Sequence, residues 1–440
     1  MMNIYTIALI WLLLAVICGY KKPAMSLPFL VSLQLLVPYS ISFNVGVNLN
    51  IFNLSVLIFM LLSLRMIQKN KPVNSQIKTY LKGYFLYVCV YSFLVSFSTF
   101  TFGEYIQNMI LFFFEYIGIA YCLNYVRFDD RSIKYFNIAI IVSSIIIIVY
   151  GIFNYIVKVN PYMLYINLVA DIDVDYANEF MDEQRGFLDG RISSTFRHPL
   201  QLGQAALLLF CYILYGMQDK LNKVLYILIL IGLIVMCVLC GSRSAIFPLL
   251  VPILFYLKNI KIHKKFLYAI VVFSVLSLAY INMPQNMQKT FKAMVFVWDE
   301  NASSNADIKG SSVSGRADQY TSAINIVKDN LLLGLGKGYV AKYGHEHSEM
   351  YGYESIVLRE LVDGGVCGLI VFVLFYLLVY RALLRGTRNP FERARIHSFC
   401  GSFLISSFLT GVSYSFFSLY MALCMISYHD ILNNRKKIYV

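Results

Sequence analysis

Long apolar runs separated by short polar connections make up most of the chain. Most of these runs approach the ~20 residues with which an α-helix crosses the hydrocarbon core of a bilayer. They fall near residues 3–20, 24–43, 47–64, 80–100, 106–126, 135–157, 198–216, 222–240, 244–257, 266–283, 356–380, 396–412 and 414–432. The pattern predicts an all-α polytopic membrane protein with about 13 transmembrane helices, or roughly 12 to 14 because some runs are short or poorly separated.

The amino-acid composition supports this class and excludes others. Hydrophobic residues make up 59% of the 440 residues and charged residues only 14%, whereas a soluble domain has about 25% charged residues. All nine cysteines lie in or at the edge of apolar runs, without the spacing of a disulfide framework or a zinc site. A soluble enzyme, a disordered protein and a disulfide-stapled secreted module are therefore excluded.

Basic residues gather in every second connection between the runs. These connections hold 24 of the 37 lysines and arginines and comprise residues 21–22, 65–82, 127–134, 219–223, 258–265, 381–395 and the tail 435–437. Because cytoplasmic loops carry an excess of Lys and Arg, these connections are assigned to the cytoplasm and the N-terminus to the outside. The formal charge of +13 is thus mostly a topology signal, and we expect no nucleic-acid partner. The first run has no basic region before it and no cleavage site, so it is interpreted as a retained span.

Two long polar segments divide the chain into five parts. We expect transmembrane helices in residues 1–157, 198–283 and 356–440, and large extracytoplasmic loops at 158–197 and 284–355. Within the second loop, apolar residues recur at helical spacing between positions 317 and 331, which predicts an amphipathic helix.

Arginines at the predicted external face are candidates for anion binding. Arg243 lies between two apolar runs, and Arg197 directly precedes another, with Arg191 just upstream. An arginine at a membrane boundary is costly without a partner, and its guanidinium suits a phosphate bidentately, so Arg197 and Arg243 could bind one diphosphate. Alternatively, these arginines snorkel to lipid headgroups or pair with the acidic residues of their own loop. His198, which precedes Pro199, is interpreted as a helix-entry residue.

Candidate proton acceptors lie mainly near the end of the second loop. His345 and His347 could act as a base or contact sugar, and Glu354 is a carboxylate at a membrane entrance. With Glu349 the two histidines could ligate a metal, but such a pair in a polar loop is usually solvated, so we expect no metal. Glu115, inside an apolar run, is interpreted as neutral or paired.

The glycine-rich stretch of the second loop is not interpreted as a phosphate-binding loop. Residues 334–338 read Gly-Leu-Gly-Lys-Gly, which lacks the order of a P-loop and lies on the predicted external side, away from ATP.

The order of these motifs resembles the O-antigen ligase and polymerase superfamily over about residues 190–380. The motifs are Phe196–Gly203, Ser242–Ala245, Gly315–Arg316, Asn330–Gly338 and the stretch from Glu354 to Leu369. The resemblance implies a glycosyltransferase at the outer face of the cytoplasmic membrane, with an undecaprenyl-diphosphate-linked oligosaccharide as donor. It further implies no nucleotide sugar, no metal and no cofactor.

One departure from the family pattern favours a polymerase over a ligase. Ligases of the family usually carry a histidine, proposed as the base, eleven residues before the first glycine of a Gly-x-x-Gly-Leu ending. Here Gly365 begins that ending, and the position eleven residues earlier is Glu354. The base therefore stays open among Glu354, His345 and His347.

The resulting hypothesis is a polymerase that joins lipid-linked repeat units into O-antigen or capsule polysaccharide at the cell inner membrane. Arg191, Arg197 and Arg243, with Arg316 from the second loop, would bind the diphosphate. Besides this lipid-linked substrate and membrane lipid, a chain-length regulator and a flippase are the partners considered. The alternatives are a ligase, a flippase of lipid-linked glycans, which would show charges along the spans and a repeated half, and a non-catalytic scaffold.

Overall fold

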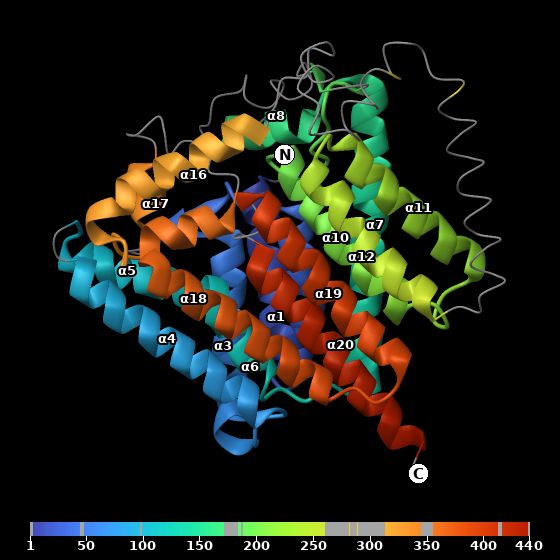
Figure 1. Cartoon of the computed structure of the whole chain (residues 1–440). Coiled ribbons are helices and arrows are strands. Elements are labelled where there is room, and N and C mark those ends of the chain that lie inside the picture. Colours follow the sequence, from blue (N-terminus) through green and yellow to red (C-terminus); the bar gives the residue numbers. More distant parts are fainter. Residues whose placement is uncertain are drawn as a thin grey trace.

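The described part of the chain folds into a bundle of helices with two short β-hairpins (Figure 1). The computed structural model describes residues 3–44, 48–96, 99–170, 184–185, 188–259, 281, 288, 313–344, 355–411 and 416–438. The helices are α1 (Ile4–Gly19), η1 (Pro23–Met25), α2 (Leu27–Leu36), α3 (Ile51–Lys69), α4 (Ser75–Ser96), α5 (Phe102–Phe112), η2 (Phe113–Gly118), α6 (Ile119–Leu123), α7 (Asp130–Val157), α8 (Pro161–Val169), α10 (Pro199–Gly216), α11 (Lys223–Leu239), α12 (Arg243–Lys258), α16 (Val313–Val327), η3 (Lys328–Asn330), α17 (Tyr339–Tyr343), α18 (Ile356–Arg385), α19 (Pro390–Leu409) and α20 (Phe417–Ile438).

The two hairpins are antiparallel. Strand β1 (Ser42–Asn44) pairs with β2 (Asn48–Asn50), with Phe43 opposite Leu49. Strand β3 (Gln184–Arg185) pairs with β4 (Leu188–Asp189) inside the first predicted loop. These hairpins were not predicted from the sequence.

Helices occupy every predicted apolar run that falls within the described residues, and the run 266–283 lies outside them except for residue 281. Among the described residues, five helices are long and apolar enough to cross a membrane, namely Ile51–Lys69, Phe102–Leu123, Asp130–Val157, Pro199–Gly216 and Ile356–Arg385. Helix α2 has only ten residues, too few to cross alone, because its run is interrupted by Pro38 and the β1–β2 hairpin. A largely helical membrane protein is thus supported, whereas about 13 spans stays a prediction.

Helix α10 lies at the centre of the bundle. It contacts α7, α11, α12, α19 and α20, and 94% of its apolar window is buried inside the protein. By contrast, only 39% of the window of α7 is buried, and apolar side chains such as Val149 and Ile156 point outward. Outward apolar side chains suit contact with lipid chains.

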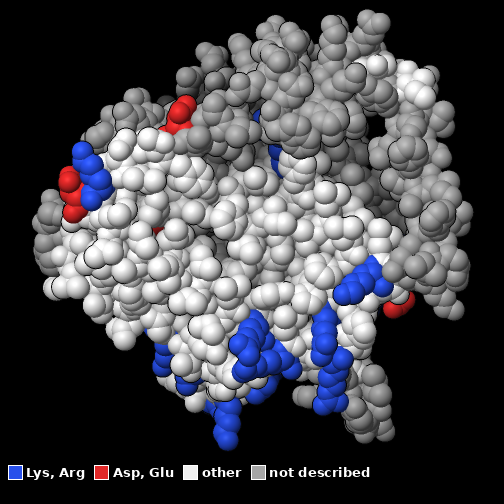
Figure 2. All heavy atoms as spheres, viewed as in Figure 1, with Lys and Arg blue, Asp and Glu red and all other residues white. Residues whose placement is uncertain are grey.

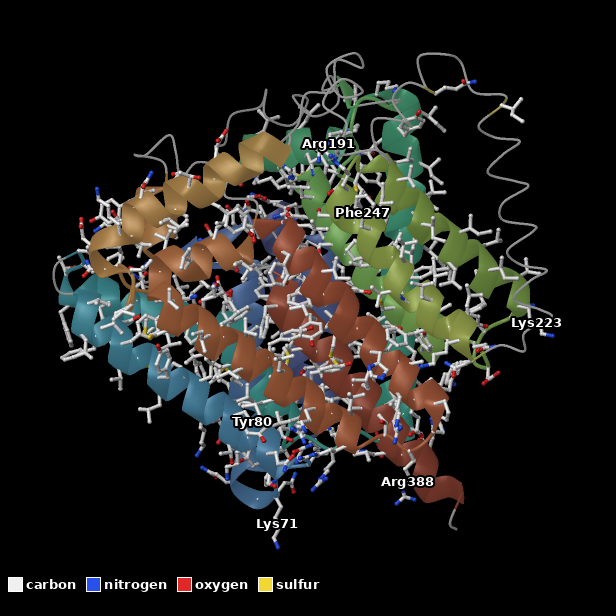
Figure 3. The ribbon with its side chains drawn as sticks, in the orientation of Figure 1. Lys71, Tyr80, Arg191, Lys223, Phe247 and Arg388 are labelled. Carbon is white, nitrogen blue, oxygen red and sulfur yellow. The ribbon has the colours of Figure 1, made fainter. Side chains whose placement is uncertain are left out.

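Basic side chains gather at one end of the bundle, the lower end in Figure 2. Figure 3 places Lys71 and Arg388 at this end and Arg191 at the opposite, upper end, while Lys223 lies at the right-hand side, at the start of α11. Lys71 and Arg388 come from two of the alternating connections assigned to the cytoplasm, and these two lie at the same end. Which compartment that end faces stays a prediction.

Candidate functional site

The arginine segment, residues 190–197, lies against the turn between α11 and α12. Arg191 is only 1% exposed, and its Nε donates a hydrogen bond to the carbonyl oxygen of Cys240 at 2.9 Å. Gly241 has φ +63°, and a Cβ there would lie 3.1 Å from Cγ of Arg191. Arg191 therefore supports the turn that leads directly into Arg243.

Polar contacts from three other parts of the bundle hold the arginine segment. Asn160 donates from Nδ2 to Oγ of Ser193 at 3.0 Å and to the carbonyl of Ser194 at 2.9 Å. The Ser194 hydroxyl donates to the carbonyl of Ile147 at 2.8 Å, and the Thr195 hydroxyl to the carbonyl of Leu35 at 2.9 Å. Because these groups are buried, the segment has one defined path into α10.

Arg197 emerges at the end of this segment and is half-buried. Its guanidinium carbon lies 5.8 Å from the centre of the Tyr39 ring, within the range of a cation–π contact. The next residue, His198, caps α10: its Nδ1 accepts a hydrogen bond from the backbone N–H of Leu200 at 3.0 Å. The interpretation of His198 as a helix-entry residue is confirmed.

Arg243 is the first residue of α12, after the N-cap Ser242. The turn before it packs on α10, because a Cβ at Gly203 would lie 2.7 Å from Cβ of Ala245 and 2.8 Å from Sγ of Cys240. The elements that carry Arg191, Arg197 and Arg243 therefore meet at one end of the bundle, the end where Figure 3 places Arg191. The N-terminus of α12 adds a positive dipole end there.

The other predicted site residues cannot be placed next to this cluster. Arg316 lies in α16, but its side chain is outside the described residues. His345, His347 and Glu354 also lie outside them. Among the residues that the structure describes, no group of three or more His, Cys, Asp or Glu side chains could hold a metal ion.

A cavity of about 60 Å³ opens beside Arg197. Its lining comes from chain segments far apart in the sequence: Gln34, Val37, Pro38, Tyr39, Asn50, Ile51, Phe52, Glu115, Phe196, Gln201, Phe416 and Leu419. Tyr39 belongs both to this lining and to the contact with Arg197. The sequence interpretation treated Glu115 as a neutral or paired carboxyl inside an apolar run; the structure adds that it is half-buried and lines this cavity.

The glycine loop, residues 334–338, docks onto α18 through backbone contacts. The N–H of Leu335 donates to the carbonyl of Val362, and that of Gly336 to the carbonyl of Asp363, both at 2.9 Å. Helix α18 is kinked at this point, where Gly365 has φ 63° and ψ −167°. A Cβ at Gly334 would lie 2.4 Å from the backbone nitrogen of Gly365, so no larger residue fits.

Lys337 of the glycine loop is buried and forms an ion pair with Glu360 of α18. Its ammonium also lies 5.4 Å from the ring centres of both Phe112 and Tyr116. Asp363 accepts hydrogen bonds from the N–H groups of Gly338 at 3.1 Å and of Val340. The glycine loop therefore has a structural role at the kink of α18.

The sequence interpretation missed this docking. Lys337 and Glu360 are separated by a segment that includes residues outside the described ranges, and no fixed spacing marks such a pair. The repeated glycines could have indicated this contact, because two backbones can approach each other this closely only at residues without a Cβ.

These helices define the class of the protein before any comparison. Several apolar helices of membrane length, joined by connections that place basic residues at one end, form a multi-pass membrane protein. Residues 227–373 match a family model described as O-Antigen ligase. The resemblance to the O-antigen ligase and polymerase superfamily is thus confirmed over this stretch, which supports a membrane enzyme of the ligase or polymerase type. None of the curated proteins compared with the chain matches it.

The matched stretch contains two of the features described above. It includes the turn before Arg243 and the contact of the glycine loop with the kink at Gly365. Arg191 and Arg197 precede the match, so their link to the site is supported by the packing of the arginine segment.

Proposed function

We propose that the protein is a polysaccharide polymerase of the inner membrane that joins undecaprenyl-diphosphate-linked repeat units at the extracytoplasmic face. The observation that carries this proposal is the meeting of the segments of Arg191, Arg197 and Arg243 at the bundle end opposite the basic connections. With basic connections in the cytoplasm, these arginines face the outside, where a surface glycan is assembled. A flippase would supply the substrate, and a chain-length regulator is a further candidate partner.

In the proposed reaction an acceptor hydroxyl attacks the anomeric carbon of the donor sugar. The bond between that carbon and the diphosphate oxygen breaks, and negative charge builds on the leaving diphosphate. Arg197 and Arg243, with Arg316, would stabilise this charge more in the transition state than in the ground state. Glu354, His345 or His347 would take the proton of the acceptor hydroxyl.

A ligase is the second candidate, because the matched family model is described as O-Antigen ligase. Glu354 at the position of the usual ligase histidine favours the polymerase. A gel of surface glycan from a deletion strain separates the two. Loss of a polymerase leaves single repeat units on the acceptor, whereas loss of a ligase removes attached glycan and lipid-linked polymer accumulates.

The diphosphate site is tested by Arg243→Ala. We expect polymer synthesis to fall about 10²- to 10³-fold, since one preorganised donor to a developing charge contributes that much. The readout is polymer amount and length on a gel, at matched protein level. Arg388→Ala, at the opposite end of the bundle, is the matched control and should leave polymer unchanged. Unchanged polymer in Arg243→Ala would show that the diphosphate site is misplaced.

A further inference from the structure

The cavity beside Arg197 contains a polar group without a hydrogen-bond partner among the described residues. Oε1 of Gln34 is buried and accepts no hydrogen bond from them, and the Gln34 side chain as a whole is only 8% exposed. A buried acceptor without a partner costs about 1–3 kcal/mol, so it points to a group that enters the cavity and donates a hydrogen bond.

The rest of the lining specifies the chemistry of that group. Glu115 supplies a carboxyl, while Gln201 and Asn50 supply amides. Aromatic rings of Phe52, Phe196 and Phe416 supply apolar faces. A lipid chain would leave Oε1 of Gln34 unsatisfied, and the residues that line the cavity include no lysine or arginine to bind a phosphate. A sugar matches both kinds of lining, because its hydroxyls donate and accept while its ring carbons are apolar.

The backbone around Glu115 is also unusual. Glu115 lies in the π-helical turn η2, within the apolar helix Phe102–Leu123. Such turns are rare and occur often at functional sites. An ionisable side chain inside an apolar span costs free energy, so its presence there is a reason to look for a function.

The position of the cavity indicates which sugar it takes. Tyr39 lines the cavity and contacts the guanidinium of Arg197, which is proposed to bind the diphosphate. The sugar nearest to a diphosphate is the one bonded directly to it. The cavity of about 60 Å³ holds the hydroxyl-bearing edge of a ring and not a whole oligosaccharide.

We propose that this cavity binds the first sugar of the lipid-linked donor, with Gln34 and Glu115 hydrogen-bonding its hydroxyls. The inference rests on the proposed function, because that function supplies the diphosphate at Arg197. It adds a sugar-recognition site in the N-terminal half of the chain, outside the matched stretch 227–373.

The test compares two ligands on the purified full-length protein in nanodiscs. One is undecaprenyl diphosphate, and the other is the lipid-linked repeat unit extracted from the deletion strain. The ratio of their dissociation constants measures how much the sugars add to the binding affinity. We expect Gln34→Met and Glu115→Met to weaken binding of the repeat unit about ten-fold or more. Binding of undecaprenyl diphosphate should stay within about two-fold, since the diphosphate contacts are intact, which also shows that the variants are folded.

Two further variants separate the inference from the proposed function. Gln107→Met, on an exposed position of α5, makes the same chemical change away from the cavity and should leave both constants unchanged. Arg197→Ala should weaken the binding of both ligands. If the wild-type protein binds both ligands equally, or if Gln34→Met and Glu115→Met keep the full affinity for the repeat unit, the sugar site is wrong. If Arg197→Ala leaves the affinity for both ligands unchanged while Gln34→Met and Glu115→Met weaken binding of the repeat unit, the diphosphate site is wrong and the sugar site stands.

Discussion

The glycine loop and the arginine segment both bring a buried cation to the end of a helix, but they hold it differently. Lys337 is paired with the carboxylate of Glu360 and lies near two aromatic rings. Arg191 donates from Nε to the carbonyl of Cys240, an uncharged group. The first contact is an ion pair with a carboxylate, whereas the second is a hydrogen bond to the turn that leads into Arg243.

The two regions therefore differ in what their buried cation supports. Lys337, with the carboxylate of Glu360, fixes the glycine loop on α18. Arg191 supports the turn that leads into Arg243, which we propose to bind the diphosphate. We therefore expect loss of Lys337 to act mainly on stability and loss of Arg191 to act mainly on polymer synthesis.

The largest expected effect is on stability, from Lys337→Met. This change leaves Glu360 buried without its partner and should lower the free energy of unfolding by about 3–5 kcal/mol. Thermal unfolding of the purified protein in detergent measures it. The double variant Lys337→Met/Glu360→Gln should recover part of the loss; a single variant as stable as the wild type would contradict the structural role of Lys337.

A second variant tests the backbone contact of the same loop. Gly365→Ala forces a side chain into φ 63° and ψ −167°, with its Cβ 2.5 Å from the carbonyl of Leu332. We expect a loss of about 2–3 kcal/mol, measured in the same way. Gly83→Ala is the matched control, since that glycine is helical with nothing within 4 Å, and it should stabilise the helix slightly.

For the arginine segment we expect a small effect on stability and a large effect on polymer synthesis. Arg191→Met removes the charged hydrogen bond to the carbonyl of Cys240, for which we expect a loss of stability of about 1.5 kcal/mol. Polymer synthesis should nevertheless fall strongly, because the turn before Arg243 loses its support. Melting temperature and polymer amount are measured side by side. A variant that is strongly destabilised yet polymerises normally would remove the contrast between the two regions.

The smallest effect on stability is expected for His198, directly after the arginine segment. His198→Ala removes the cap of α10 and should lower stability by about 1 kcal/mol, with polymer synthesis retained. His198→Asn keeps a capping side chain and should melt like the wild type. A loss of polymer in both variants, without loss of stability, would assign His198 to the reaction.

The positions of the helices could be predicted from the sequence because apolar runs of membrane length leave few alternatives. The boundaries were less certain where polar residues join a helix. Helix α7 begins at Asp130, ahead of the predicted start at 135, because its first turn is polar and is capped by Asp129, whose side chain accepts from the N–H of Ser132. Hydropathy registers the apolar part of a helix and not its cap.

The site could be predicted only in part. Arg197 and Arg243 were proposed from the sequence because arginines at membrane boundaries are rare and costly, and their role stays a prediction. The cavity could not be found, since Gln34, Glu115 and Gln201 come from three separate helices and their meeting depends on packing. For the same reason the kink of α18 was missed: Gly365 is unusual only because Gly334 touches it.

The contact between Gly334 and Gly365 limits how the sequence can be recombined. Neither backbone can move without the other, because each occupies the space where a Cβ of its partner would be. A chimera that exchanges the second loop with that of a related protein should therefore carry the first turns of α18, through Gly365, from the same parent. A crossover point between the two glycines would combine the glycine loop of one parent with the α18 kink of the other, and the two backbones would not be complementary.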